Sequence, residues 1–582
     1  MVQLPPVHCR GVDFRTLLGD DGQPIGDRVR AARIEAMLGA LAKAAPDVVV
    51  TETFPFGRRQ LAAEFLALLE TAEARPRRPA ILASIRDILN PPSSAAKAVE
   101  AQERLGRHYD GVLVHGDRAV APLDASWPVD PALARMLHYT GYVVEQAPGD
   151  GPAPAPGHDI LVSGGGSAAS LPLFRAAVAA AATWPGPQRW RLLVGQGVPQ
   201  ADFDALAAHQ GEGLVVERAR PDFTRLLAGA ALSVSQAGYN TAIDIAVARV
   251  PAVVVPFEQG HEAEQRLRAE CFAASGLVGI VAEQDLTPES LARAVAETLA
   301  RPRPARCPLN LDGIAGSIRV IEDHAGRAAA LDRALARAAA TGKVIEFWWR
   351  DDDAVEPGPK LDRLLDLAGR HGVPLALAVI PQGATAALAS RLADLPVAVL
   401  VHGLAHRNNA PPGTKKQELG HLPPAALAAD LAVARAHLAD LFGDRLLPVL
   451  VPPWNRIEPE LVPLLPAAGF AGLSSYGRQP AAAVPGLVQA NSHVDPIDWR
   501  GGGGLVSPVA LFADLAAHIE AIVDGSAPAE PIGLLTHHLV QDAWTWAWIE
   551  RFVALVQSGR GTRFISAQQV FKPDCPPAVD YL

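Results

Sequence analysis

Three adjacent carboxylates, Asp351, Asp352 and Asp353, follow an apolar and aromatic run in the sequence KVIEFWWRDDDAVEP, residues 343–357. Neighbouring carboxylates repel one another, and each resists losing water unless a positive charge lies close by. A solvated turn would satisfy them. A metal cation with a catalytic base beside it would satisfy them better, provided that further ligands follow downstream.

Two histidines could be those ligands. The segment VAVLVHGLAHRNN, residues 397–409, reads as a buried strand that ends in His402 and His406. On a helical turn, imidazoles four residues apart lie on one face and can share a metal ion. Two histidines and one aspartate with open positions form a common catalytic metal site. The alternative is a pair of surface histidines at the end of a strand.

Three later segments also place polar residues directly after predicted strands: VPPWNRI at 451–457, HVDPIDWR at 493–500 and IGLLTHHLVQD at 532–542. They would supply a backbone N–H at Trp454 toward an oxyanion, the carboxylates of Asp495 and Asp498, and the imidazole of His537. In α/β barrels the active site is assembled at the C-terminal ends of the strands. The five segments therefore predict one site at a barrel mouth.

The five motifs, in this order, resemble those of the polysaccharide deacetylases of carbohydrate esterase family 4, over residues 343–582. The resemblance implies that Asp352 is the general base and His537 the general acid. It also implies a divalent metal ion, expected to be Zn²⁺, on three ligands: Asp353, His402 and His406. Such an ion would polarise an N-acetyl carbonyl, so the implied reaction is metal-dependent deacetylation of an amino-sugar glycan.

Two positions depart from the family pattern or have no part in it. Val451 stands where family members usually carry arginine, so we expect Arg350 or Arg456 to hold the base carboxylate instead. Asp351 has no implied role, and we expect it to be a solvated turn residue.

The tryptophans near this site divide into two kinds. A spacing of four residues is typical of the buried stripe of a helix, and it relates Trp544, Trp548 and Phe552. Trp499 follows the aspartate motif directly. It is therefore the better candidate for stacking on a sugar.

A second site is indicated by two glycine turns. The segment DILVSGGGSAAS, residues 159–170, reads as strand, turn and helix, with Gly164 and Gly165 in the turn, but alone it could serve only close packing. Further on, a strand leads into Gly238 at a helix start, where free N–H groups and the helix dipole favour a diphosphate. Asp244, two turns later, could accept hydrogen bonds from ribose hydroxyls.

The second stretch resembles the C-terminal half of the family 28 glycosyltransferases. The residues that carry the resemblance are Ser235, Ala237, Gly238, Thr241, Asp244, Pro256, Phe257, Glu264 and Gln265. The resemblance implies a GT-B fold, that is, two Rossmann-like domains over about residues 1–325, with a UDP-sugar donor held mainly by the second domain. The alternative is an alanine-rich Rossmann fold without a ligand.

The first unit begins unusually. VQLPPV reads as a strand from residue 2, and the strand, glycine turn and helix that open a Rossmann-like domain are missing before the strand at 46–52. In the family this turn carries a Gly-Gly-His motif near the acceptor and the catalytic base. His8, Arg86 and Asp87 are the remaining candidates for that role.

Alternating β-branched and Ala/Leu-rich segments predict an α/β protein: twin GT-B domains, the first lacking its opening βα unit, then a distorted (β/α) barrel of the deacetylase type. The predicted divisions are an acceptor-side domain at 1–148, a donor-side domain at 149–325, a linker helix at 326–342 and the deacetylase-like domain at 343–582. The Pro/Gly-rich segment 145–158 is the expected linker between the first two.

The amino-acid composition limits which classes of molecule the protein is expected to bind. The net charge of −10 is spread out and no Lys/Arg block is present, so nucleic acid is not expected as a partner. Apolar runs are far shorter than a membrane span, which leaves only peripheral membrane association. Four widely spaced cysteines and the lack of a secretory leader favour the cytoplasm.

These observations together predict a bifunctional carbohydrate-active enzyme, which transfers a sugar from a UDP-sugar and removes an acetyl group from an amino-sugar glycan. In the first alternative the GT-B half only binds sugar nucleotide or glycan and targets the deacetylase. In the second, the two histidines and the aspartate hold Fe(II) for oxygen chemistry. In the third, the substrate is an amide that is not a carbohydrate.

Overall fold

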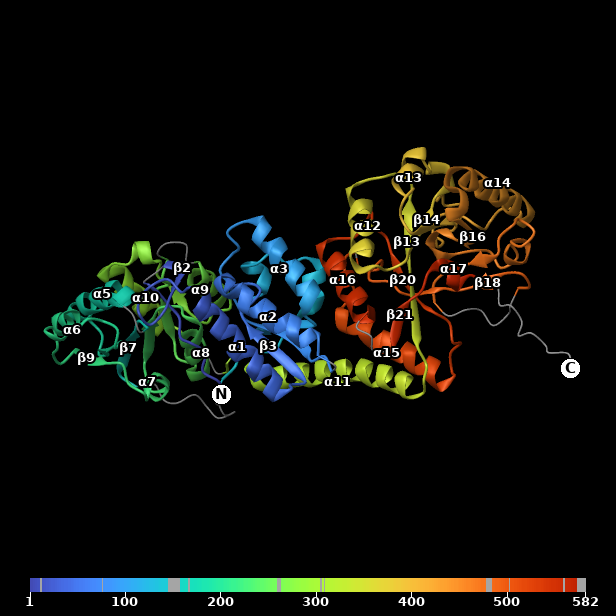
Figure 1. Ribbon diagram of the computed structural model, residues 1–582. Coiled ribbons are helices and arrows are strands. Elements are labelled where there is room, and N and C mark those ends of the chain that lie inside the picture. Colours follow the sequence, from blue (N-terminus) through green and yellow to red (C-terminus); the bar gives the residue numbers. More distant parts are fainter. Residues whose placement is uncertain are drawn as a thin grey trace.

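The structure is a computed structural model that describes residues 1–10, 13–75, 77–144, 157–165, 168–258, 263–303, 306–307, 309–477, 484–501, 503–557 and 561–572. Three α/β units follow one another along the chain. Figure 1 shows the first unit, in blue, between the second, in green, and the third, in yellow to red. The expected linker at 145–158 falls mostly outside the described residues.

The first unit is built on a parallel sheet whose strand order is β3-β4-β5-β6. Its strands are β3 (Val48–Glu52), β4 (Ala80–Arg86), β5 (Gly111–His115) and β6 (Leu137–Tyr139), and its helices are α1 (Asp27–Ala44), α2 (Ala62–Glu73), α3 (Ala95–His108) and α4 (Pro131–Met136). The strand predicted from residue 2 is wrong. Two prolines remove backbone donors there, and the chain first becomes extended at β1 (His8–Arg10), which pairs with β2 (Asp13–Leu18).

The second unit has a parallel sheet of order β12-β11-β10-β7-β8-β9. Its strands are β7 (Asp159–Ser163), β8 (Arg189–Val194), β9 (Leu214–Arg218), β10 (Leu232–Ser235), β11 (Ala252–Val254) and β12 (Gly279–Ile280), with helices that include α5 (Leu171–Ala182), α8 (Tyr239–Ala248), α9 (Glu264–Ala274) and α10 (Pro288–Leu299). The chain runs outward from β7 in one direction and from β10 in the other. The crevice between these two strands is therefore the switch point where open α/β sheets bind ligands.

The third unit is a curled parallel sheet, as predicted. Its strands are β13 (Ile345–Ala354), β14 (Leu375–Val379), β15 (Val397–His402), β16 (Leu446–Val451), β17 (Gly472–Leu473), β18 (Val488–Gln489), β19 (Ser492–Val494), β20 (Ile532–Thr536) and β21 (Thr562–Phe564). Beyond β17 the chain bonds to β19, because the N–H of Ser492 donates to Ser475 at 2.9 Å and that of Gly477 donates to Ser492 at 2.8 Å. These bonds join the two sides of the curled sheet into a distorted barrel.

Helices α12 (Pro359–His371), α14 (Pro424–Phe442), α15 (Pro508–Asp524) and α16 (Ala543–Gln557) surround the barrel strands. The core stripe predicted on α16 is confirmed, because Trp544, Trp548 and Phe552 are each at most 1% exposed. One hydrophobic cluster runs from the first unit into the third. The two units therefore share a core.

Helix α11 (Gly313–Ala340) connects the second unit to the third, and it is longer than the predicted helix at 326–342. It runs along the first unit toward α15 (Figure 1). A Cβ on Gly316 would lie 2.2 Å from the carbonyl oxygen of Thr140, so only glycine permits this approach. Within the described residues, no helix is both long enough and apolar enough to span a membrane.

Candidate metal centre and nucleotide-sugar crevice

The structure brings Asp353, His402 and His406 together at the C-terminal edge of the barrel sheet. The Oδ1 atom of Asp353 lies 3.1 Å from Nε2 of His402 and 3.3 Å from Nε2 of His406. One ligand atom from each residue falls within 4.8 Å of the others. Three donors this close can share one small cation.

The two histidines do not share a helical turn, and that expectation is wrong. His402 is the last residue of β15, whereas His406 lies in a loop with a left-handed backbone (φ 56°). A buried carboxylate, Glu418, shapes this loop by accepting the N–H groups of Leu404, Ala405 and Arg407 at 2.8–3.0 Å. Sequence reasoning missed Glu418, because its bonds reach back 11 to 14 residues across an irregular loop.

A second hydrogen bond orients His402 for ligation. Its Nδ1 lies 3.0 Å from the carbonyl oxygen of Val451, so this nitrogen carries the proton and donates it. Nε2, which faces Oδ1 of Asp353, is then the nitrogen that can ligate a metal ion, as is usual for metal-bound histidines. Val451, where the family usually has arginine, contributes this carbonyl.

Arg350 holds the carboxylate of Asp352, which settles the choice between the two candidate arginines. Nη2 of Arg350 donates to Oδ2 of Asp352 at 3.1 Å, and Nε lies 2.9 Å from Oδ1. Both side chains are buried. Arg456 instead donates to the carbonyl of Lys416, at 2.7 Å. The guanidinium therefore fixes the position of the Asp352 carboxylate next to the three candidate ligands.

Asp351 is not the solvated turn residue that we expected. It is fully buried in β13, where it pairs with Nδ1 of His538. It also accepts hydrogen bonds from the hydroxyl of Thr536, at 2.6 Å, and from the N–H of His538, at 3.0 Å. The contact fixes the end of β20, which carries His537, to β13. A second histidine after the final strand was the available signal for this pair.

Replacing Asp351 by asparagine is expected to destabilise the third unit. Asparagine would remove one partner of a buried pair, which typically costs about 3 kcal/mol or more and here would lower the Tm by roughly 6–12 °C. Asp362→Asn is the control, because this residue pairs with Arg391 at the surface and should cost less than about 1 kcal/mol. Thermal unfolding of both variants checks the expectation, and equal Tm values would contradict it.

His537 lies close to Trp499 and Asp495. It is buried, its ring centroid is 4.9 Å from that of Trp499, and its Nδ1 has no hydrogen-bond partner within the described residues. Trp499 is 56% exposed and donates from Nε1 to Asp495 at 2.8 Å. An exposed indole beside a buried imidazole suits a sugar-binding wall next to a proton donor.

Trp454, the residue proposed to donate its N–H to an oxyanion, also lies at this site. Its backbone is left-handed (φ 55°), and its ring centroid is 4.3 Å from that of His406. The direction of its N–H toward a substrate oxygen stays a prediction.

The charges at the site favour cation binding. Burial opposes ionisation of Asp353, but the hydrogen bond from His402 and the charges of the neighbouring imidazoles lower its pKa to about 2. Asp353 is therefore a carboxylate at neutral pH. For His406, burial lowers the pKa, which leaves a neutral imidazole able to ligate. Burial lowers the pKa of His402, but the hydrogen bond with Asp353 and the charges of Asp352 and Asp353 raise it overall, so a cation on Nε2 would replace a proton there. One carboxylate and two imidazoles are donors that suit Zn²⁺ once that proton has left.

In the second unit, the predicted donor-binding residues follow the ends of three adjacent strands: β7, β10 and β11. Gly164 packs so tightly that a Cβ would lie 2.3 Å from the Ser170 side chain, and Gly165 has a left-handed backbone (φ 67°). Gly238 is the N-cap of α8, and a Cβ at this position would have no described atom within 4 Å. Thr241 and Asp244 lie on α8, both partly buried.

Phe257, Glu264 and Gln265 lie beyond β11. The N–H of Phe257 donates to the side-chain oxygen of Gln265 at 3.2 Å, which places these two side by side. Glu264, at the start of α9, accepts from Arg268 at 2.7 Å. The structure therefore gathers the predicted residues at the switch point of the sheet, whereas their contact with a nucleotide stays a prediction.

Arg268 and Asp87 form an ion pair between the first two units that the sequence did not reveal. Their atoms Nη2 and Oδ1 lie 2.9 Å apart, and both side chains are at most 1% exposed. Asp87 also accepts from the hydroxyl of Tyr142 at 3.2 Å. Because its carboxylate is enclosed and fully engaged, Asp87 does not suit the role of a transferase base.

Comparisons with known proteins bear on both halves. The family model of the glycosyltransferase family 28 C-terminal domain matches residues 160–306. The chain is 32% identical over 142 residues to the UDP-N-acetylglucosamine--N-acetylmuramyl-(pentapeptide) pyrophosphoryl-undecaprenol N-acetylglucosamine transferase of Cupriavidus necator. This match covers 24% of the chain and 39% of the transferase, so the chain spans about two fifths of that relative's length.

Two solved structures are also similar. MurG of Acinetobacter baumannii aligns at 16% identity and a TM-score of 0.36, over 52% of this chain and 83% of that one. A family 4 acetyl xylan esterase from Clostridium thermocellum, in complex with a cobalt ion, aligns at 16% identity and a TM-score of 0.26, over 39% of this chain and 90% of that one. The family match lies within the second unit, whose residues 160–306 match the model of the glycosyltransferase family 28 C-terminal domain.

Proposed function

We propose that the third unit is a metal-dependent deacetylase of an amino-sugar glycan and that the first two units transfer a sugar from a UDP-sugar. The observation that carries the first part is the convergence of Asp353, His402 and His406 beside an arginine-held carboxylate, Asp352. The predicted domain limits at 148, 325 and 342 belong to this proposal, as do zinc as the ion and the cytoplasm as the location.

In the proposed mechanism, Asp353, His402 and His406 would hold the ion, which when bound polarises the acetyl carbonyl and acidifies water. Asp352 takes the proton of the attacking water, with its carboxylate held in place by Arg350. His537 protonates the leaving amine, next to Trp499 and to the Asp495 carboxylate that Trp499 contacts. Trp499 stacks on the sugar, and Trp454 donates its N–H to the oxyanion.

Acetate release tests this reaction. The full chain should release acetate from a tetramer of N-acetylglucosamine when loaded with zinc, and the rate should be the same without dioxygen. A rate that depends on dioxygen would support iron-based oxygen chemistry instead. Acetate release only from simple acetanilides would point to an amide substrate that is not a carbohydrate.

The transferase half of the proposal depends on the crevice at β7, β10 and β11. The N-cap position of Gly238 would offer N–H groups to a diphosphate, and Asp244, on the same helix, would accept hydrogen bonds from ribose hydroxyls. The Cupriavidus necator relative carries UDP-N-acetylglucosamine in its name, so this donor is the first to test.

Gly238→Asp is expected to weaken UDP binding at least about tenfold, because a carboxylate at the N-terminus of α8 would repel the diphosphate. The fold should tolerate it, since φ is −63° and no described atom lies within 4 Å of the added Cβ. Gly211→Asp is the matched control: it makes the same change of charge in the same unit, also in open space. Calorimetric titration with UDP measures both, and equal affinities would contradict the assignment.

A second candidate function for the first two units is sugar-nucleotide or glycan binding without transfer. It is favoured by Asp87, whose carboxylate is enclosed by Arg268 and Tyr142 and so cannot act as a base. Binding of UDP-N-acetylglucosamine without transfer to any glycan acceptor would support this candidate, whereas sugar transfer would reject it.

A further inference from the structure

One residue of the first unit reaches into the third unit beside the proposed deacetylase site. Arg135, near the end of α4, donates from Nε to the carbonyl of Leu505 at 2.7 Å and from Nη2 to the carbonyl of Gly503 at 3.2 Å. Its Nη1 also donates to Oδ2 of Asp498, at 3.2 Å. One guanidinium thus makes three hydrogen bonds to residues more than 360 positions away in the sequence.

These three bonds span the two arms of a small hairpin, which we name the Trp499 loop (residues 495–501 and 503–506). Ile497 and Leu505 pair across it as an isolated antiparallel bridge. The N–H of Asp498 donates to Gly504, at 2.9 Å, and the N–H of Val506 donates to Pro496, at 2.8 Å. Because Arg135 holds a side chain on one arm and carbonyls on the other, it clamps the loop closed.

The loop carries the groups that face His537. Trp499 lies at its tip, with its ring centroid 4.9 Å from that of His537 and its Nε1 bonded to Asp495 at the base of the loop. Because Trp499 is exposed, burial contributes little to holding its ring in place. Its position therefore depends on the bond to Asp495 and on the backbone of the loop, to whose two arms Arg135 bonds.

Three further contacts hold the part of the first unit around Arg135 against the third unit. Asp130, the N-cap of α4, accepts from Nε1 of Trp544 at 2.9 Å, and a Cβ on Gly106 would lie 2.9 Å from the carbonyl oxygen of Trp544. On the same interface, Arg551 donates to the buried carboxylate of Asp110 at 2.6 Å. α3 and α16 lie side by side there (Figure 1). Arg135 is therefore presented from a rigid support.

We propose that Arg135 is a positioning residue for the deacetylase-like site: it holds the Trp499 loop in the conformation that binds the sugar. The first unit then contributes to both proposed activities: it is part of the transferase-type fold, and it holds a loop of the deacetylase-like unit in place. This inference rests on the proposed deacetylase function for its kinetic consequence, but its structural part does not depend on catalysis.

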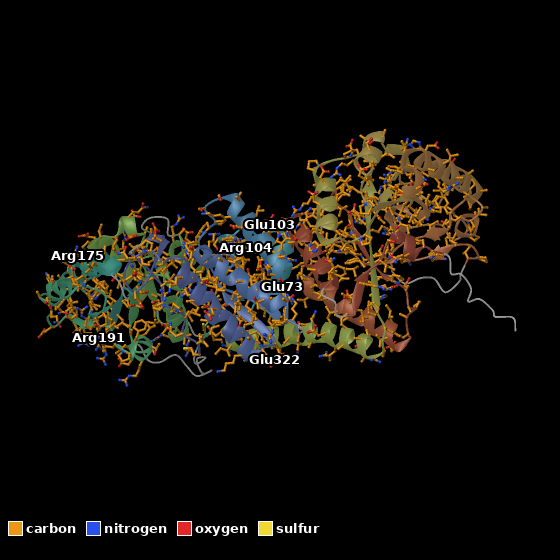
Figure 2. The ribbon with its side chains drawn as sticks, viewed as in Figure 1. Glu73, Glu103, Arg104, Arg175, Arg191 and Glu322 are labelled. Carbon is orange, nitrogen blue, oxygen red and sulfur yellow. The ribbon has the colours of Figure 1, made fainter. Side chains whose placement is uncertain are left out.

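The test compares the full chain with Arg135→Ala and Arg135→Lys, and with Arg175→Ala as the matched control. Arg175 lies in the second unit, at the end of the molecule away from the third unit (Figure 2), in an exposed ion pair with Asp202. Two quantities are measured: the affinity for a tetramer of N-acetylglucosamine, by calorimetry, and amide hydrogen exchange in residues 495–506. Where acetate is released, KM and kcat are measured as well.

For Arg135→Ala we expect affinity to fall about tenfold or more, KM to rise by the same factor with kcat within about threefold, and exchange at Asp498, Gly503 and Val506 to quicken at least tenfold. Arg135→Lys keeps one charged donor and should lie in between. Arg175→Ala should match the unmodified chain.

Two results would overturn the proposal: unchanged exchange in the Trp499 loop of Arg135→Ala, or faster exchange there with unchanged tetramer affinity. If the unmodified chain binds the tetramer but releases no acetate, the deacetylase proposal fails, while the exchange and affinity measurements still decide the role of Arg135. If Arg135→Ala lost structure generally, amide exchange would be faster throughout the barrel. In that case the exchange rates and the tetramer affinity of Arg135→Lys decide the outcome, provided that its exchange is faster in the Trp499 loop alone.

Discussion

Asp352→Asn is expected to lower the rate of acetate release by about a thousandfold while the bound metal is retained. Asparagine keeps the shape of aspartate and can still accept a hydrogen bond from Arg350, but it cannot take a proton from water. The three metal ligands are other residues, so zinc content should stay at the level of the unmodified chain. Stopped assays for acetate and elemental analysis for zinc measure the two quantities separately.

The control for Asp352→Asn is the neighbouring Asp351→Asn. Both substitutions remove a buried charge from β13, so both should lower the Tm, but only Asp352 is assigned to the attacking water. Below the unfolding range, we expect Asp351→Asn to keep at least about a tenth of the rate. If the two variants lost activity equally, the assignment of Asp352 as the base would be wrong.

Asp353→Ala is expected to abolish both zinc binding and acetate release, the latter by about a thousandfold or more, because the charged ligand of the site is removed. Asp353 has a left-handed backbone (φ 72°), which strains alanine. Asp353→Gly is therefore made as well, since glycine adopts this conformation freely and also lacks the carboxylate.

The matched control for these variants is Asp366→Ala, which removes an exposed carboxylate from α12 in the same unit. It should leave zinc content and rate unchanged. Treating the unmodified chain with a chelator should reproduce the loss seen in Asp353→Ala, and added zinc should restore activity only in the unmodified chain. Full activity after complete removal of metal would show that the reaction needs no ion.

The sequence predicted which strands end in polar residues, because a buried apolar run followed directly by Asp or His is a local pattern. This was enough to place Asp353, His402 and His537 at one edge of a sheet. It did not give the loop geometry between His402 and His406, which depends on Glu418 and on left-handed residues rather than on a helical period.

Contacts between segments far apart in the chain could not be predicted from the sequence. Asp351 meets His538 across 187 residues, and Asp498 meets Arg135 across 363. From sequence alone, a carboxylate with no visible partner is best assigned to solvent, and this reasoning led to the wrong expectation for Asp351.

The central claim, that one ion sits on one carboxylate and two imidazoles, is tested most directly by diffraction from zinc-loaded crystals at the zinc absorption edge. We expect a single strong anomalous peak about 2.0–2.2 Å from Oδ1 of Asp353 and from Nε2 of both His402 and His406. A zinc-saturated crystal with no anomalous peak among these three side chains would contradict the account.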